Sequence, residues 1–466
     1  MEKVRLGFVP SQRDVFYRKW ARDMRVRVMK AFEEIEEIEI IAPDGGITKD
    51  GLVASDKDSD KVLNLFQKKG IDGIIIGTMT FGNEIPAISI PARMPGLPVL
   101  LFGTKEGPFT PDRNRLSDSF CGTLSIASGL YRRKRPFVFL GICFPEEDLF
   151  KEKIRNFAST VKAVQSFVGA KIGVIGARPE PFETCAINEI PLIERFGQRL
   201  IQVPLPDVFA AARNLKDSDT AVKKALSEIY KCANCSAVTR PALLRAVKLE
   251  IALTNIAKER GLSGMGVECW PSMQSDYKIA ACLTLARLTE KGIMAACETD
   301  VHGALTMVIQ YNATFCSTVP HFIDWTIQHQ TMDDVFLAWH CGNAPMCLAG
   351  KNSCVKVMPH SIITRLQSTE TSQSTVEFEL EPGVVTLIRL EEYDGKFKML
   401  ITTGELISTG DSFRGAGGWV KVENLDKLYR TLVEEGFVHH ASMIHGDLTA
   451  PLTDFCKLLG IQSIVV

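Results

Sequence analysis

The sequence predicts an α/β protein built from two consecutive open-sheet domains and a C-terminal, mostly antiparallel β domain. Two features of the chain support this prediction. Over the first two-thirds, short apolar runs rich in β-branched residues alternate with segments of helical periodicity, which is typical of parallel strands joined by helices. After about residue 350, strand-like runs follow one another with only turn-length linkers, which is typical of an antiparallel sheet.

Buried strands separated by helical segments define the first predicted domain, residues 1–168. The strands are expected at Val4–Val9, Ile38–Ile41, Ile71–Ile76, Val99–Gly103 and Phe137–Ile142. Helices are expected at Arg18–Ile35, at Asp58–Lys69 and from about Glu146 to Val168, where apolar residues recur at helical spacing. This alternation predicts a parallel sheet.

The second predicted domain, residues 169–315, begins with a new strand at Lys171–Gly176 and continues with Leu200–Val203 and Gly264–Cys269. The third, residues 316–466, contains the remaining β segments, which are expected at Thr375–Leu380, Val384–Leu390, Phe397–Thr402 and Glu405–Ile407. A helix is expected at Asn424–Glu435, ending at Gly436 because glycine readily adopts the left-handed conformation that terminates helices.

Composition excludes several classes of protein. A net charge of −1 argues against a nucleic-acid binder and against a cationic membrane-surface protein. The amino-terminal residues lack the charged-then-apolar pattern of a signal peptide, and no apolar run reaches the ~18 residues of a membrane span. The thirteen cysteines are odd in number and scattered through apolar segments, as expected for reduced thiols. We therefore expect a soluble, cytoplasmic protein.

Nucleotide-binding and zinc motifs are missing from the sequence. Gly173–Gly176 lacks the third glycine and the following acid of a dinucleotide fingerprint, and no Walker-type lysine follows a glycine loop. Cys232 and Cys235 form a lone CxxC on a predicted helix, without the second ligand pair that a zinc ribbon needs. We interpret them as ordinary thiols.

Histidine occurs only in the last third of the chain, because all eight histidines lie between His302 and His445. Just before this region, Glu298 follows a strand expected at Gly292–Cys297. Acids at the carboxyl end of a parallel strand face the crevice where open α/β sheets bind ligands. Asp300 is expected to cap the following helix, which leaves Glu298 without a structural explanation.

Three more polar residues interrupt apolar runs in the same region: Asp324, His340 and His440. Strand alternation would turn only one of His439 and His440 inward. Taken singly, each of these residues could be a satisfied core residue. Together with Glu298, they make an oxygen-rich site of two carboxylates and two imidazoles, suited to Mn²⁺, Mg²⁺ or Co²⁺.

The segment Cys297–Met307 resembles the first-acid segment of the L-fucose/L-arabinose isomerase superfamily. Members of this superfamily are metal-dependent aldose–ketose isomerases with two Rossmann-like domains and a C-terminal β-barrel domain. The resemblance in domain order covers nearly the whole chain, and its specific part runs from about Gly264 to Asp447. It implies an aldose–ketose isomerase that uses Mn²⁺ and needs no organic cofactor.

The resemblance also implies the roles of the site residues. Glu298 and Asp324 would both bind the metal and transfer the C1/C2 proton, while His340 and His440 would complete the ligand set. Asp324 in place of a glutamate resembles the fucose branch, whereas the pair His340 and His440 resembles the arabinose branch. The sugar therefore stays open among pentoses, 6-deoxyhexoses and C6-modified hexoses such as sulfosugars.

Five further residues are candidates for sugar binding: Gln12, Arg13, Glu268, Trp270 and Asn343. Gln12 and Arg13 follow the first strand, and the resemblance implies that this domain reaches the site of a neighbouring subunit in a homo-oligomer, a trimer or hexamer. A solvated helix start is an equal alternative for them. Trp270 could stack on a sugar or lie in the core, and Glu268 ends a strand near the same crevice.

Two other functions stay open from the sequence. A non-catalytic sugar-binding or sensing protein would need no metal site. A metal-dependent sugar hydrolase or aldolase would use the same ligands but would not exchange solvent deuterium into unreacted sugar.

Overall fold

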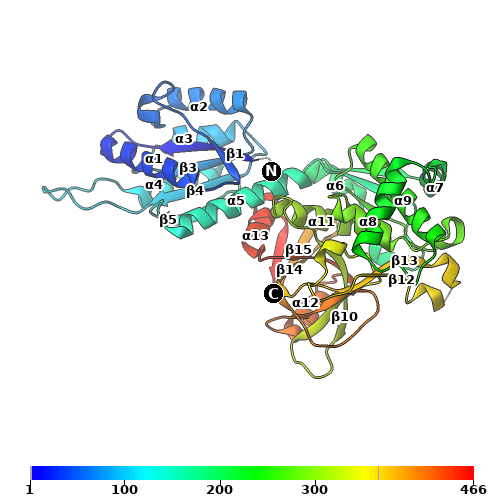
Figure 1. The fold of residues 1–466 in the computed structure, drawn as a ribbon. Helices are drawn as coiled ribbons and strands as arrows, with labels where there is room; N and C mark the ends of the chain where they lie inside the picture. The colour runs from blue at the N-terminus through cyan, green and yellow to red at the C-terminus, as the bar shows by residue number, and fades with distance from the viewer. Residues whose placement is uncertain (1–2, 366) are drawn as a thin grey trace. The chain divides into compact units, whose positions relative to one another are not determined.

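The computed structural model describes residues 3–365 and 367–466. It has an α/β fold with two parallel sheets and a larger mixed sheet (Figure 1). The chain divides into two compact units: unit 1 contains the residues up to Gln165 and Ala450–Ile461, and unit 2 contains Ser166–Thr449 and Gln462–Val466. Among the described residues, no helix is both long enough and apolar enough to cross a bilayer.

Unit 1 is built on a five-stranded parallel sheet of order β2-β1-β3-β4-β5. Its strands are β1 (Val4–Ser11), β2 (Ile38–Ile41), β3 (Gly73–Thr78), β4 (Val99–Thr104) and β5 (Val138–Cys143). Its helices are α1 (Arg18–Glu33), α2 (Asp56–Lys69), α3 (Glu84–Ala92), α4 (Ser119–Arg132), most of α5 (Asp148–Phe167) and α13 (Thr449–Leu459). All five predicted strands are confirmed, with small shifts at their ends.

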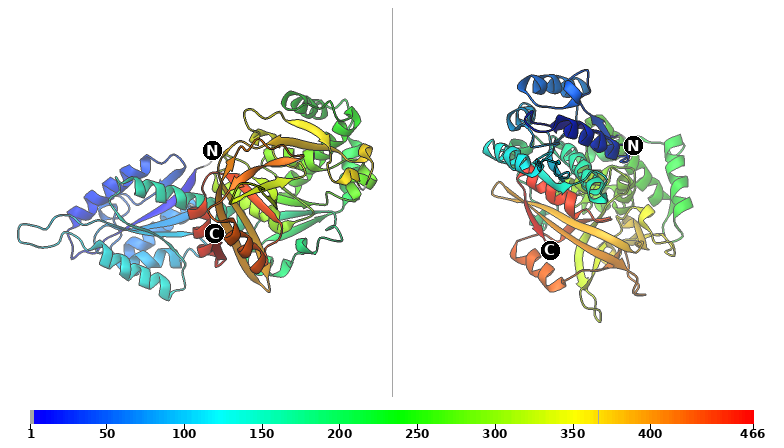
Figure 2. Two further views of the ribbon diagram at one scale, coloured as in Figure 1. Left: turned by 90° about the horizontal axis from the view of Figure 1, so that it is seen from below. Right: turned by 90° about the vertical axis from the view of Figure 1, so that its left-hand side faces the viewer.

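Local sequence explains these elements. Every residue of β3 is buried, as expected for a strand covered on both faces. Ser55 and Asp58 form a reciprocal capping box at the start of α2, and Gly70 ends that helix with a φ of 63°. Figure 2 shows α13 beside α5, where the Thr160 hydroxyl donates to the Pro451 carbonyl at 3.0 Å. A helix from the end of the chain thus packs in unit 1.

Unit 2 contains the second parallel sheet, of order β7-β6-β8-β9. Its strands are β6 (Lys171–Ile175), β7 (Arg199–Val203), β8 (Gly264–Val267) and β9 (Met294–Cys297). The helices in this part of the chain are α6 (Glu189–Phe196), α7 (Leu205–Asn214), α8 (Thr220–Cys232), α9 (Arg240–Arg260), α10 (Cys282–Glu290) and α11 (Val301–Ala313). Cys232 ends α8, so Cys235 lies beyond the helix on which the sequence placed both cysteines.

Unit 2 also contains a nine-stranded mixed sheet of order β12-β13-β16-β11-β10-β17-β14-β15-β18. The strands are β10 (His321–Gln328), β11 (Val335–His340), β12 (Lys356–Pro359), β13 (Gln373–Glu379), β14 (Gly383–Tyr393), β15 (Lys396–Ile407), β16 (Ala416–Lys421), β17 (His440–His445) and β18 (Gln462–Val465), with α12 (Leu425–Glu434) before β17. An additional pairing joins β15 to β16.

The mixed sheet is mostly antiparallel, as predicted, but it differs from the prediction in two details. The pairings β13–β16 and β15–β18 are parallel, so the sheet is not purely antiparallel. The two short strands predicted at Phe397–Thr402 and Glu405–Ile407 are one continuous strand, β15, because its residues pair with β14 without interruption from Lys396 to Leu406. The cap at Gly436 is confirmed by its φ of 67°.

Candidate active site

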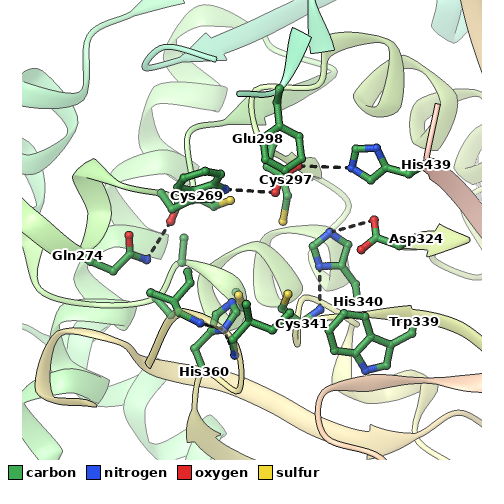
Figure 3. A pocket seen from close by; sticks show the side chains of 17 residues that line it. Cys269, Gln274, Cys297, Glu298, Asp324, Trp339, His340, Cys341, His360 and His439 are labelled. Atoms are coloured by element: carbon green, nitrogen blue, oxygen red, sulfur yellow. Dashed lines mark hydrogen bonds and ion pairs between the residues drawn. The ribbon is translucent and has the colours of Figure 1, made fainter. Parts of the chain in front are cut away.

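A cavity of about 300 Å³ lies in unit 2 near the carboxyl end of β9. Figure 3 shows its lining, which includes Glu298 from the end of β9, Asp324 from β10 and His340 from β11. His440, the first residue of β17, is 1% exposed and lies behind this wall. The structure therefore brings the four residues singled out from the sequence to one place.

The backbone at Glu298 is held in an uncommon conformation. Glu298 and Thr299 both have left-handed backbones, with φ of 59° and 58°, and such positions cost about 1–3 kcal/mol each unless their surroundings impose them. Thr299 is fixed by bonds from its N–H to the Val267 carbonyl at 3.2 Å and from its hydroxyl to the Ala177 carbonyl at 2.9 Å. Gly266 permits this turn, since a Cβ there would lie 2.7 Å from the Thr299 carbonyl carbon.

The two carboxylate oxygens of Glu298 have different partners. Trp270 Nε1 donates to Oε1 at 3.2 Å, while Oε2 lies 3.0 Å from His440 Nε2 and 3.9 Å from His439 Nε2. Burial favours the neutral carboxyl, but the two imidazoles outweigh it and lower the pKa of Glu298. Glu298 is thus held ionised with one oxygen anchored and the other facing the histidines.

Asp324 lies near both His440 and His340, and the strand register accounts for its closeness to His440. It pairs with Trp339 of β11 on one side and with His440 of β17 on the other. Its Oδ1 lies 3.7 Å from His440 Nε2 and 3.9 Å from His340 Nε2. Directly opposed residues in antiparallel strands project from the same face, which explains why Asp324 and His440 meet.

Four buried polar atoms of this site have no hydrogen-bond partner: Glu298 Oε2, Asp324 Oδ1, His340 Nε2 and His440 Nε2. Buried polar groups are normally paired, so their convergence on one point needs an explanation. The ligand atoms of Asp324, His340 and His440 lie within 4.8 Å of one another, as do those of Cys185, Glu298 and His440. Oxygen and imidazole donors in this arrangement could hold a divalent cation.

The charge balance agrees with a cation. In the described part of the chain, the ion pairs of Glu298 and Asp324 involve only histidines, and no lysine or arginine neutralises them. The surrounding carboxylates raise the pKa of His440 against the opposing effect of its burial. A cation would take the place of the proton that this concentration of negative charge attracts.

The opposite side of His440 contacts a buried ionic network. Its Nδ1 lies 2.9 Å from Asp300 Oδ2, and Arg389 donates to both Asp300 oxygens, at 2.5 and 3.2 Å. Arg389 Nε also donates to Glu391 Oε1 at 2.7 Å, and Glu391 Oε2 lies 3.5 Å from His302 Nδ1. Each of these side chains is at most 5% exposed.

Asp300 combines two roles. It caps α11 as the sequence predicts, since the Gly303 N–H donates to Oδ1 at 2.7 Å. Burial favours its neutral form, but the positive charge of Arg389 outweighs this and lowers the pKa of Asp300. The sequence did not predict this network; its only signal was the charged pair Arg389 and Glu391, spaced two residues apart in an otherwise apolar strand.

Glu268 and Trp270, two of the five predicted sugar-binding residues, lie just after β8 of the second parallel sheet. Trp270 lines the cavity and orients Glu298. Glu268 is not among the cavity's lining residues; its carboxylate accepts from the Ala177 N–H at 2.7 Å and from the Ser272 hydroxyl. This placement lets Glu268 fix the loop after β6.

The other three predicted sugar-binding residues are also outside the lining. Asn343 is buried, with Oδ1 3.2 Å from His321 Nε2 and Nδ2 3.4 Å from Cys297 Sγ. Gln12 and Arg13 belong to unit 1, where Gln12 Nε2 donates to the Arg13 carbonyl at 2.8 Å.

Gln274 and His360 are polar lining residues that the sequence analysis did not single out. Gln274 Oε1 is buried without a partner. His360 accepts hydrogen bonds at Nδ1 from the N–H groups of Ile362 and Ile363, both at 3.1 Å, so its neutral ring carries the proton on Nε2. Both lie far along the chain from Glu298, and only tertiary packing brings them to the cavity.

Relatives align along most of this chain. A sulfoquinovose isomerase from Alkalicoccus urumqiensis is 26% identical over 402 residues, 85% of this chain and 86% of the relative. Another from Priestia aryabhattai is 24% identical over 427 residues, 90% of each chain. Among solved structures, the fructose-binding periplasmic domain of a hybrid two-component system covers 57% of this chain and 73% of its own, at 12% identity. Its TM-score of 0.15 supports no inference.

Family models match both ends of the chain. Residues 7–168 match the N-terminal domain of fucose/sulfoquinovose isomerase, and residues 338–466 match the C-terminal domain of L-fucose isomerase. Together the two matches cover more than half of the chain, in the order that the sequence resemblance implied. The chain therefore belongs to the fucose isomerase-like superfamily and is an aldose–ketose isomerase.

Proposed function

We propose that this enzyme is a metal-dependent isomerase that interconverts an aldose and a ketose form of a free monosaccharide through a cis-enediolate. The observation that carries the proposal is the convergence of unpaired, buried Glu298, Asp324 and His440 atoms beside a cavity of about 300 Å³. Pockets for small ligands begin at about this volume.

The chemistry divides between the two carboxylates. The reaction moves a proton between C1 and C2, and Glu298 and Asp324 are the bases within the cavity that could remove and return it. Trp270 holds Glu298 by one oxygen, which leaves the other oxygen to act. A bound divalent cation would offset the negative charge that develops on the sugar oxygens.

Mn²⁺ is the metal we propose, with Mg²⁺ and Co²⁺ as alternatives. Carboxylate and imidazole donors suit these ions, and the donor set avoids the thiolates that favour softer metals. Cys185 lies near the group, but its Sγ is 3.8 Å from His440 Nδ1, the ring nitrogen already bonded to Asp300. No organic cofactor is needed for this chemistry.

The relatives and the cavity lining favour different sugars. Relatives named sulfoquinovose isomerases align over 84–90% of the chain, which makes a sulfosugar the first substrate to test. The described lining of the cavity contains no lysine or arginine and much apolar surface, including Ala280, Ala281, Ile362 and Ile363. A neutral 6-deoxyhexose would suit that wall, whereas a sulfonate would need donors from elsewhere.

Arg13 and Gln12 stay proposed as those donors, supplied by a neighbouring subunit of a trimer or hexamer. A guanidinium binds a sulfonate through paired hydrogen bonds. An active monomer in solution would contradict this shared site. We also propose a cytoplasmic enzyme, because its thirteen cysteines are odd in number and scattered through apolar segments, as expected where thiols stay reduced.

The test is a substrate panel assayed with purified protein. Metal is removed with a chelator, Mn²⁺, Mg²⁺ or Co²⁺ is restored, and ketose formation is measured from sulfoquinovose, L-fucose, L-arabinose and unmodified hexoses. We expect turnover of at least one sugar, dependence on added metal, and exchange of solvent deuterium at C2. Metal-independent turnover, or sugar binding without turnover across the panel, would overturn the proposal.

A further inference from the structure

Two histidines of the site carry their proton on different ring nitrogens. His440 Nδ1 lies 2.9 Å from an oxygen of the ionised Asp300, which can only accept, so Nδ1 carries a proton and Nε2 is the ring nitrogen left to bind a cation. In His340 the arrangement is reversed. The Cys341 backbone N–H donates to His340 Nδ1 at 2.8 Å, so this nitrogen is an acceptor.

The bond from Cys341 determines the state of the His340 ring. A doubly protonated ring could not accept at Nδ1, and a neutral ring carries one proton, which must then lie on Nε2. A metal ligand needs a lone pair at Nε2. To bind a cation at Nε2, His340 would have to move its proton to Nδ1, where it would face the Cys341 N–H donor at 2.8 Å, or lose the proton and become an anion.

Nε2–H of His340 faces an acceptor that also lacks a partner. His340 Nε2 and Asp324 Oδ1 are both buried and unpaired, and they lie 3.9 Å apart. A small movement would bring them to hydrogen-bond distance. The carboxylate would then have one oxygen fixed and the second, Oδ2, left for the cation and the sugar.

We propose that His340 donates a hydrogen bond from Nε2–H to Asp324 and is a positioning residue, not a ligand of the cation. The inference rests on the proposed function and assigns the four residues of the site to two roles. Glu298, Asp324 and His440 hold the cation, and His340 sets the orientation of Asp324. This assignment differs from the ligand role that the family resemblance implies for His340.

Pulsed electron paramagnetic resonance of bound Mn²⁺ tests the proposal, because it detects imidazole nitrogen bonded directly to the metal. We expect one such nitrogen in the wild type. It should persist in His340→Gln and disappear in His440→Gln. Two coupled nitrogens in the wild type, one of which is lost in His340→Gln, would overturn the inference while leaving the metal-dependent function intact.

Activity and the tautomer supply independent readouts. His340→Ala should lower kcat by about 10–100-fold, the usual effect of losing a partner that orients a ligand. His340→Gln should recover part of this loss in kcat, since its amide N–H can still donate to Asp324. Equal losses in both variants would contradict a donor role.

¹⁵N spectra of the metal-free enzyme should show the His340 proton on Nε2, and a proton on Nδ1 would overturn the proposal. Failure of the wild type to bind Mn²⁺ would instead overturn the proposed function, and the tautomer would still decide this inference.

Discussion

Asp300 Oδ2 lies 2.9 Å from His440 Nδ1 and also accepts a hydrogen bond from Arg389. The contact joins a candidate ligand on β17 to the N-cap of α11 and, through Arg389, to β14. Carboxylates bonded to the far nitrogen of a metal-binding imidazole fix its orientation and raise its basicity. The position of His440 therefore depends on residues that never touch the cavity.

Asp300→Asn should weaken Mn²⁺ binding by about 10–100-fold, because the neutral amide is a poorer partner for His440 Nδ1–H. The dissociation constant is measured by titration of metal-free protein, with circular dichroism to confirm folding. Asp426→Asn, at an exposed acid paired with Arg430, is the matched control and should bind Mn²⁺ normally. Unchanged affinity in Asp300→Asn would show that His440 does not depend on this contact.

Arg389→Met should destabilise the fold. Arg389 is fully buried, and its removal leaves the carboxylates of Asp300 and Glu391 without a cation. Breaking a buried ion pair from one side costs about 3–5 kcal/mol. Urea denaturation measures the change, with Arg430→Met as the control because that arginine is exposed and should contribute no more than about 1 kcal/mol. Similar losses in both variants would contradict the prediction.

Much of the fold could be predicted because it depends on local pattern. The strands of unit 1 read as continuous apolar runs, and both caps at Asp300 and Gly436 follow from the conformational preferences of those residue types. Strand pairing was harder to predict, since β13 pairs with β16 and β15 pairs with β18 across long stretches of chain. No local signal specifies such a partner or its direction.

In the site, too, individual residues could be predicted from local pattern, whereas their tertiary contacts could not. Glu298 and Asp324 stood out because a carboxylate in an apolar run needs a partner. Glu298 follows the end of a parallel strand, but Asp324 lies within β10 of the mixed sheet, so their convergence depends on tertiary packing. Arg389 could not be assigned, because its role arises from the packing of β14 against α11. The tautomer of His340 likewise depends on one backbone N–H, a matter of geometry and not of residue type.

Acid should destabilise the protein through His321. Burial lowers the pKa of His321 from 6.5 to about 3. Between these values the unfolded state binds the proton and the folded state does not, so the free energy of unfolding falls as pH drops from 6.5 toward 3. His321→Leu should make this fall shallower by up to one proton, about 1.4 kcal/mol per pH unit. Parallel curves for the variant and the wild type, from denaturation at several pH values, would refute the assignment.

Glu298→Gln and Asp324→Asn distinguish metal binding from proton transfer. Both substitutions keep the shape and one oxygen donor but abolish basicity. A residue that only binds metal should lose affinity and recover its rate at high Mn²⁺, whereas a base should lose about 10²–10⁴-fold in rate even when the metal site is saturated. We expect the second result for both, together with loss of solvent-deuterium exchange at C2, measured by mass spectrometry of recovered sugar. Near-normal turnover of either variant at saturating Mn²⁺ would remove that residue from the catalytic pair.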